Sequence, residues 1–260
     1  MGPEILIWVL VLYLGAAVGS FLNVAIHRMP LGESVVKPRS RCPSCRSAIA
    51  WYDNIPVLSW LLLRGRCRGC GASISIRYPF IELVTALIAL VLFAREGLSV
   101  AFAVQFVFAC ALLVVAYIDL DHQIIPDKIS LPGIVLGLVA AAPGGAPQIL
   151  DAALGVLVGG GILLSVAWVY ERSTGREGMG GGDVKLLAMI GAFLGWQGVL
   201  LTLLLGSLLG SAIGIVLMTS RGADRRVAIP FGPFLSLGAL VTLFWGHMIV
   251  RWYISYAGWS

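Results

Sequence analysis

The chain has 260 residues, of which 59% are hydrophobic and only 12% charged, and its mean hydropathy is +0.94. A soluble globular domain carries about 25% charged residues, so this composition excludes that class and predicts an integral membrane protein. The net charge of +5 does not indicate a nucleic-acid partner, because the cationic residues lie beside apolar segments, where they orient membrane helices.

Apolar segments of about 20 residues can cross a bilayer as helices. The first apolar segment, residues 5–24, is longer than the hydrophobic part of a secretory signal and has no basic segment before it, so we interpret it as a retained anchor. The predicted fold class is therefore all-α and polytopic, with about eight transmembrane helices. They cover residues 5–26, 79–94, 98–118, 129–142, 149–170, 184–197, 198–218 and 231–254.

The distribution of Lys and Arg predicts the orientation, because these residues accumulate in cytoplasmic loops. With eight spans, all of the 18 Lys and Arg residues except Arg95 and Arg251 lie on one side of the membrane. Joining the sixth and seventh spans would move Arg221, Arg225 and Arg226 to the other side. The pattern favours a break at residues 195–198, both termini outside the cytosol, and attraction to anionic lipid headgroups.

The one long loop, residues 29–78, contains four of the five cysteines. Cys42 and Cys45 form one C-x2-C pair and Cys67 and Cys70 form another, a spacing close to that of tetrahedral zinc sites. Two disulfides would need an oxidising compartment, whereas the charge pattern places this loop in the reducing cytosol. The spacing predicts a structural zinc ion, because four thiolates leave no position open for water.

Three acids follow the third predicted span, at Asp119, Asp121 and Asp127. An ionisable residue at a membrane boundary indicates a functional site. If the helix continues to Asp121, the two-residue spacing turns its side chain about 200° from that of Asp119. Asp127 precedes the next span and suits a helix cap. Asp119 is therefore the best candidate to face the bundle interior.

A second acid, Asp183, follows Gly180, Gly181 and Gly182, where a polar loop meets the span predicted to begin at residue 184. Glycines without side chains allow a substrate backbone to approach closely. Asp183 as a simple helix cap in a flexible loop is the alternative. Because Asp119 is expected at the same depth, the two acids suggest a carboxylate dyad. In such a pair one acid takes a proton from water while the other polarises a carbonyl, which is aspartic peptide hydrolysis.

Together these features resemble the bacterial prepilin peptidases, also called type IV leader peptidases. The resemblance rests on Asp119 after an apolar span, on the string Gly180 to Lys185 (GGGDVK), and on the four cysteines of the first loop. It extends over nearly the whole chain. Further matching strings are residues 19–24 (GSFLNV), 56–60 (PVLSW), 64–67 (RGRC) and 77–79 (RYP), the last leading to Glu82.

The resemblance implies an intramembrane aspartic protease whose catalytic acids match Asp119 and Asp183. It implies as substrates the precursors of type IV pilins and of the pseudopilins of type II secretion, cut after a glycine at the cytoplasmic face of the bacterial inner membrane. Family members with a long cysteine-bearing loop also methylate the new N-terminal amine from S-adenosylmethionine. The expected parts are residues 1–28 as the first transmembrane helix, 29–78 as a cytoplasmic zinc-knuckle domain and methyltransferase part, and 79–260 as a seven-helix peptidase core.

Two alternatives come from other functional classes. A proton-coupled transporter also uses intramembrane acids, but it would need them near the bilayer centre rather than at span ends. A non-enzymatic zinc-loop sensor explains the cysteines but not the two boundary aspartates. Away from the dyad, Glu82 is expected to pair with a cation such as Arg77 or Lys185. Gly155 and Gly159 are among the small residues at helical spacing that predict close helix packing.

Overall fold

The computed structural model describes residues 2–142, 147–175, 180–221 and 230–256, and every regular element in these ranges is a helix. Arg176, Arg225 and Arg226, whose charges helped to predict the orientation, lie outside the described residues. The chain forms two compact units, residues 1–110 and 111–260. The predicted partition into three parts stays a prediction.

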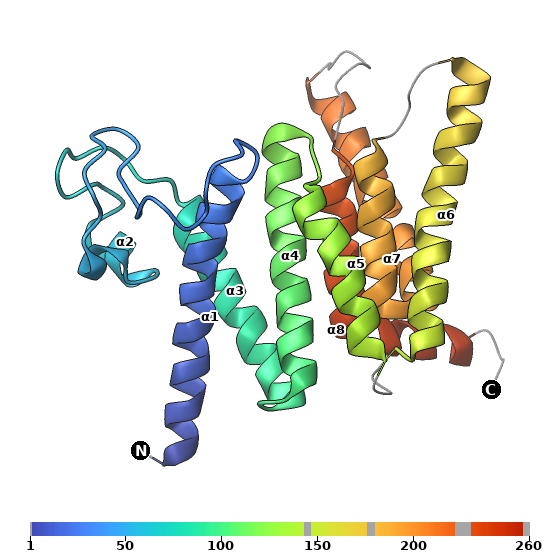
Figure 1. The fold of residues 1–260 in the computed structure, drawn as a ribbon, viewed down its shortest axis with the longest axis horizontal. Coiled ribbons are helices and arrows are strands. Elements are labelled where there is room, and N and C mark those ends of the chain that lie inside the picture. Colours follow the sequence, from blue (N-terminus) through green and yellow to red (C-terminus); the bar gives the residue numbers. More distant parts are fainter. Residues whose placement is uncertain (1, 143–146, 176–179, 222–229, 257–260) are drawn as a thin grey trace. The chain divides into compact units, whose positions relative to one another are not determined.

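The first unit contains α1 (Pro3–Arg28), the 3₁₀ helix η1 (Trp51–Asn54), the short α2 (Leu58–Leu62), α3 (Arg77–Glu96) and the start of α4 (Val100–His122). α1 packs along α3 (Figure 1). Glycines on α1 allow the close approach, since a Cβ at Gly19 would lie 2.6 Å from the Cα of Glu82. The polypeptide between α1 and α3 forms loops that surround η1 and α2.

The second unit contains the end of α4, α5 (Asp127–Ala141), α6 (Ile149–Thr174), α7 (Gly181–Arg221) and α8 (Gly232–Tyr256). α7 packs against α5, α6 and α8. Figure 1 shows α5, α6 and α7 side by side. The predicted close packing at glycines is confirmed for α6, because a Cβ at Gly159 would lie 2.5 Å from the carbonyl oxygen of Leu187 on α7. The main-chain atoms of Gly155 and Gly191 meet in the same interface.

The eight predicted spans correspond to helices or half-helices of the structure. Among the described residues, six helices are long and apolar enough to cross a membrane: α1, α3, α4, α6, α7 and α8. α5 is shorter, with 15 residues. α7 runs for 41 residues but is interrupted at Gly195, whose φ of 70° and ψ of 177° are not helical. This interruption lies at the break predicted between the sixth and seventh spans, and the chain is a multi-pass membrane protein.

Candidate active site and metal centre

Asp119 lies in the last turn of α4, and only 5% of its surface is exposed. Its Oδ2 atom accepts a hydrogen bond of 3.0 Å from the backbone N–H of Gly232, the first residue of α8. The first N–H groups of a helix have no partner within the helix, and they carry the positive end of the helix dipole. The α8 N-terminus therefore holds the Asp119 carboxylate in place, a contact that the sequence analysis missed.

Asp183 lies in the first turn of α7, because this helix begins at Gly181. The prediction that the helix begins at residue 184 was wrong, so Gly181 and Gly182 are helical and Asp183 is not the residue before the helix. Its Oδ1 atom is buried and has no hydrogen-bond partner in the described part of the chain. Burying a carboxylate oxygen without a partner is unfavourable, which is typical of a group that acts on a substrate.

The side chain of Ile125 lies between the end of α4, which carries Asp119, and the start of α7, which carries Asp183. A Cβ at Gly182, next to Asp183, would be 2.9 Å from the Cβ of Ile125. A Cβ at Gly232 would be 3.3 Å from the Cδ1 of the same isoleucine and 2.6 Å from Oδ2 of Asp119. The ends of α4, α7 and α8 thus meet around one side chain, and the charges of Asp119 and Asp183 interact electrostatically.

The other two acids of this region have different environments. Asp121 is exposed, although it lies only two residues after Asp119 on the same helix. Asp127 was expected to cap α5, but this helix shows no side-chain cap. Asp127 instead forms an ion pair with Lys185 of α7, with Nζ–Oδ1 and Nζ–Oδ2 distances of 2.7 and 2.9 Å. This pair joins the start of α5 to the start of α7 beside Asp183.

The four loop cysteines sit on two turns with the same backbone pattern. In the first turn, the N–H of Cys42 bonds the carbonyl of Ser47 and the N–H of Arg46 bonds that of Cys42. In the second turn, Cys67 bonds Ala72 and Gly71 bonds Cys67 in the same way. The residue after the second cysteine of each turn has positive φ, 58° at Arg46 and 70° at Gly71. Each turn therefore directs two thiols to the same side.

All four cysteine sulfurs lie within 4.8 Å of one another, a group that could hold a metal ion. The four cysteines are free, and the Sγ atoms of Cys42 and Cys70 are 3.8 Å apart. A tetrahedral zinc site with Zn–S bonds of about 2.3 Å has sulfur–sulfur edges of about 3.8 Å. Hydrogen bonds from the Ser47 side chain and backbone lower the pKa of Cys45 to about 6. At Cys45 this favours the thiolate, which is the form that binds metal.

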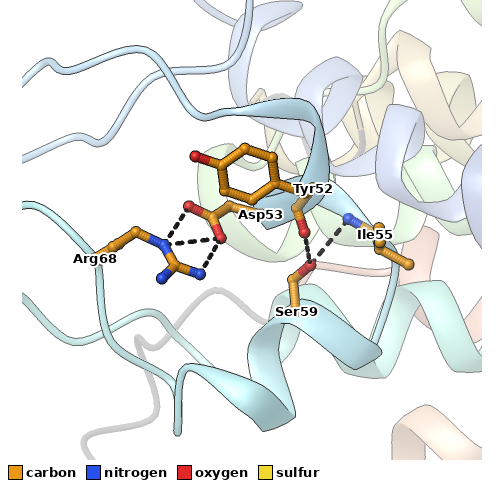
Figure 2. Close-up of polar contacts among 5 residues, drawn as sticks. All are labelled: Tyr52, Asp53, Ile55, Ser59 and Arg68. Carbon is orange, nitrogen blue, oxygen red and sulfur yellow. Dashed lines mark hydrogen bonds and ion pairs between the residues drawn. The ribbon is translucent and has the colours of Figure 1, made fainter.

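Figure 2 shows the contact between the second cysteine turn and η1. Arg68, between Cys67 and Cys70, donates to both carboxylate oxygens of Asp53 at 2.7 to 3.1 Å. Its guanidinium also lies 5.7 Å from the ring centroid of Tyr52. The hydrogen bonds from Arg68 lower the pKa of Asp53, so this carboxylate is ionised at neutral pH.

Glu82 is buried on α3, and its Oε2 accepts a hydrogen bond of 2.7 Å from the N–H of Val57, directly before α2. The expected pairing of Glu82 with a cation such as Arg77 or Lys185 stays a prediction. Glu82 therefore connects the loop between α1 and α3 to the membrane helix itself.

Family models match two consecutive parts of the chain. The bacterial peptidase A24 N-terminal domain covers residues 13–96, and the type IV leader peptidase family covers residues 106–215. A prepilin leader peptidase/N-methyltransferase of Aeromonas salmonicida is 40% identical over an alignment of 271 positions, which covers 95% of this chain and 93% of that protein. The chain belongs to the type IV leader peptidase family.

Other similar proteins of this family carry the same name. The one from Pseudomonas aeruginosa is 40% identical over an alignment of 268 positions, which covers 94% of this chain and 92% of that protein. The one from Myxococcus xanthus is 44% identical over 221 residues, 85% of this chain and 65% of its own. No solved structure matches the chain. The resemblance inferred from the sequence is confirmed, and neither a transporter nor a sensor is supported.

Proposed function

We propose that this protein cleaves the leader peptide from type IV prepilins and from the related pseudopilins, and then methylates the new N-terminal amine. The family membership supports both activities. The observation that carries the peptidase assignment is that the helix ends carrying Asp119 and Asp183, from distant parts of the chain, converge on Ile125 and that the two acids interact electrostatically. A buried acid, Asp119, beside a helix end that carries a half-buried acid, Asp183, is the arrangement that an aspartic dyad needs.

In the proposed reaction, Asp119 and Asp183 share one proton and bind one water molecule between them. The ionised acid removes a proton from this water, whose oxygen attacks the carbonyl carbon of the scissile peptide bond. The protonated acid donates a hydrogen bond to the carbonyl oxygen as negative charge develops there. The C–N bond then breaks, and the leaving amine receives a proton from the dyad. Gly232 keeps Asp119 oriented during these steps. Gly180 and Gly181 leave room for the substrate backbone, whereas Gly182 packs against Ile125.

For the second activity we propose S-adenosylmethionine as the methyl donor. When bound, this cofactor would supply the methyl group, carried on its sulfonium sulfur, that is transferred to the free amine of the mature pilin. We assign this reaction to residues 29–78.

We propose that Cys42, Cys45, Cys67 and Cys70 bind a structural zinc ion. The sulfur–sulfur edge of 3.8 Å and the two equivalent turns support this choice. Zinc would hold the two cysteine turns together, and the second of them carries the Arg68 that binds Asp53. The ion would therefore stabilise η1 as well as the loops themselves.

The positive residues near the ends of α1, α3 and α7 support a location in the bacterial inner membrane with the dyad at the cytoplasmic face. The proposed partners are prepilin and pseudopilin precursors and the lipid bilayer. The proposed parts are those expected from the sequence: a first transmembrane helix at residues 1–28, a zinc-knuckle methyltransferase part at 29–78, and a peptidase core at 79–260.

The test uses purified full-length protein, a prepilin and S-adenosylmethionine in detergent, with mass spectrometry of the mature N-terminus. Asp119→Asn and Asp183→Asn should each abolish leader removal, while methylation of an already cleaved pilin continues. Asp121→Asn, at an exposed acid on the same helix end as Asp119, is the matched control and should cleave normally. Cleavage by either dyad variant at the wild-type rate would rule out the proposed mechanism.

A further inference from the structure

The short helix α2 presents its apolar residues outward. Leu58, Leu61 and Leu62 lie at positions i, i+3 and i+4, which places them on one face of the helix, and they are 57%, 57% and 82% exposed. We call these three residues the leucine face. The polar residue Ser59 points the other way and is buried. This distribution is the reverse of that on a helix whose outer face contacts water.

The depth of α2 follows from its bond to α3. The N–H of Val57, directly before α2, donates to Glu82, which lies five residues after the first residue of α3, Arg77. With a rise of 1.5 Å per residue, this position is about 7.5 Å along α3 from its start. α3 has 20 residues, so its length of about 30 Å matches the hydrocarbon core of a bilayer. α2 therefore begins at or below the level of the lipid headgroups.

Figure 1 agrees with this depth within the first unit. In this view the cysteine-bearing loops extend beyond the end of α1, whereas α2 lies at the height of the first turns of α3. α3 also exposes apolar side chains near its start, for example Phe80 and Leu83.

The polypeptide around α2 is also suited to a place with little water, where backbone N–H groups need partners within the protein. On entering α2, Ile55 donates its N–H to the Ser59 hydroxyl, Val57 to Glu82 and Leu58 to the carbonyl of Pro56 (Figure 2 shows the first of these). On leaving it, Leu63, Arg64 and Gly65 donate to carbonyls of residues 59–61. The Trp60 indole N–H, which would otherwise be unpaired, bonds the carbonyl of Ile74 at 3.0 Å.

The charge of the loop that carries α2 complements an anionic lipid surface. Between α1 and the start of α3, cationic side chains far exceed acidic ones. The cations are Lys37, Arg39, Arg41, Arg46, Arg64, Arg66, Arg68 and Arg77, against the acids Glu33 and Asp53. Arg64 lies two residues after Leu62, the last residue of the leucine face, and is exposed. Basic side chains beside an embedded apolar face are typical of segments that lie in the membrane interface.

From these observations we propose that α2 is a membrane-interface helix, whose leucine face is embedded in the lipid leaflet on the side where α1 ends and α3 begins. Two other occupants of the leucine face would be the hydrophobic helix of a pilin and another segment of this chain. The depth set by Glu82 and the basic surroundings favour lipid. The proposal rests on the membrane placement of α3 and does not require either enzymatic activity.

The test places the photo-crosslinking residue benzoyl-phenylalanine at Leu62 of the full-length protein in nanodiscs of phosphatidylethanolamine and phosphatidylglycerol. Leu83, exposed on α3, is the positive control. Val36, an apolar loop residue that is 74% exposed, is the matched control outside the leucine face. Variants that elute as a single species in size-exclusion chromatography are irradiated with and without a prepilin. Position 58 provides a second site on the leucine face if the variant at 62 does not fold.

The proposal expects phospholipid adducts, seen in the mass of the intact protein, at position 62 as at 83 and several-fold more often than at 36, with or without prepilin. Three results would overturn it: adducts that shift to the prepilin when it is present, crosslinks to another segment of the chain, or lipid adducts at 62 no more frequent than at 36. A lipid result with an inactive wild-type enzyme would leave this proposal intact while refuting the proposed function.

Discussion

Replacing Gly232 by alanine tests the contact between the α8 N-terminus and Asp119. A Cβ at this position would lie 2.6 Å from the Oδ2 atom of Asp119, whereas ordinary contacts begin at 3.4 Å. The carboxylate or the helix end must therefore move by the difference, 3.4 − 2.6, or about 0.8 Å. The movement displaces one of the two proposed catalytic acids without removing it.

A displacement of about 1 Å at a catalytic group can lower a rate about 100-fold. We therefore expect Gly232→Ala to lower kcat for leader cleavage by about 10- to 100-fold, which corresponds to about 1.4 to 2.7 kcal/mol in the activation free energy. KM should change little, because the alanine contacts the acid rather than the hydrophobic helix of the substrate. Methylation of an already cleaved pilin should continue, since it does not use the dyad.

The matched control is Gly246→Ala, which changes a buried glycine of the same helix. Its Cβ would lie 3.0 Å from the Cγ2 of Thr242 and touches no acid. It is 14 residues further along α8, about 21 Å from Gly232 at 1.5 Å per residue. Initial rates are measured against prepilin concentration for both variants, which gives kcat and KM for each. Thermal unfolding of both variants shows whether each is folded. A folded Gly232→Ala variant with the kcat of Gly246→Ala would refute the assigned role of Gly232.

Two further predictions concern the cysteine loop. Cys42→Ser and Cys67→Ser should each release the proposed zinc ion and lower methylation more than cleavage, measured by metal analysis and by both assays on one preparation; unchanged metal content would contradict the site. Arg68→Ala should speed metal loss to a chelator relative to Arg66→Ala, its exposed neighbour. Arg68 lowers the pKa of Asp53, so Asp53 is ionised at both pH 8 and pH 6, and the ion pair should stabilise the cysteine loop equally at these two pH values. This stabilisation should be lost only below about pH 4, where Asp53 becomes protonated. If the difference in the rate of metal loss between Arg68→Ala and Arg66→Ala disappeared between pH 8 and pH 6, the role assigned to the Arg68–Asp53 ion pair would be contradicted.

The features predicted well from the sequence are those that one segment specifies by itself. Membrane spans follow from the length of apolar segments, and the cysteine turns follow from C-x2-C spacing. The break at Gly195 was predicted because a charge rule required it, and the structure shows a φ of 70° there. The packing of α6 on α7 was indicated by glycines at helical spacing, which only needed a neighbouring helix to be realised.

The features missed are contacts between residues far apart in the chain. The bond from Gly232 to Asp119 joins positions 113 residues apart, and residues 231–233 (FGP) by themselves indicate only a turn before a helix. Likewise, Asp127 was assigned to its own helix because the sequence does not show that Lys185 lies beside it. The helix start at Gly181 was missed because three glycines disfavour a helix locally, while packing on Ile125 leaves no space for a side chain at Gly182.

The choice of Asp119 over its neighbours illustrates how these two kinds of information combine. Helical periodicity alone separates Asp119 from Asp121, because both lie on α4 and face different sides. Periodicity does not say which of the two faces inward, and it says nothing of Asp127. The N-terminus of α8 distinguishes the three acids. Its first N–H donates a hydrogen bond to Asp119, while Asp121 is exposed and Asp127 forms an ion pair with Lys185. Of the three acids, Asp119 is the one that is both buried and free of a cationic side chain in these contacts, which is the state that a catalytic carboxylate requires.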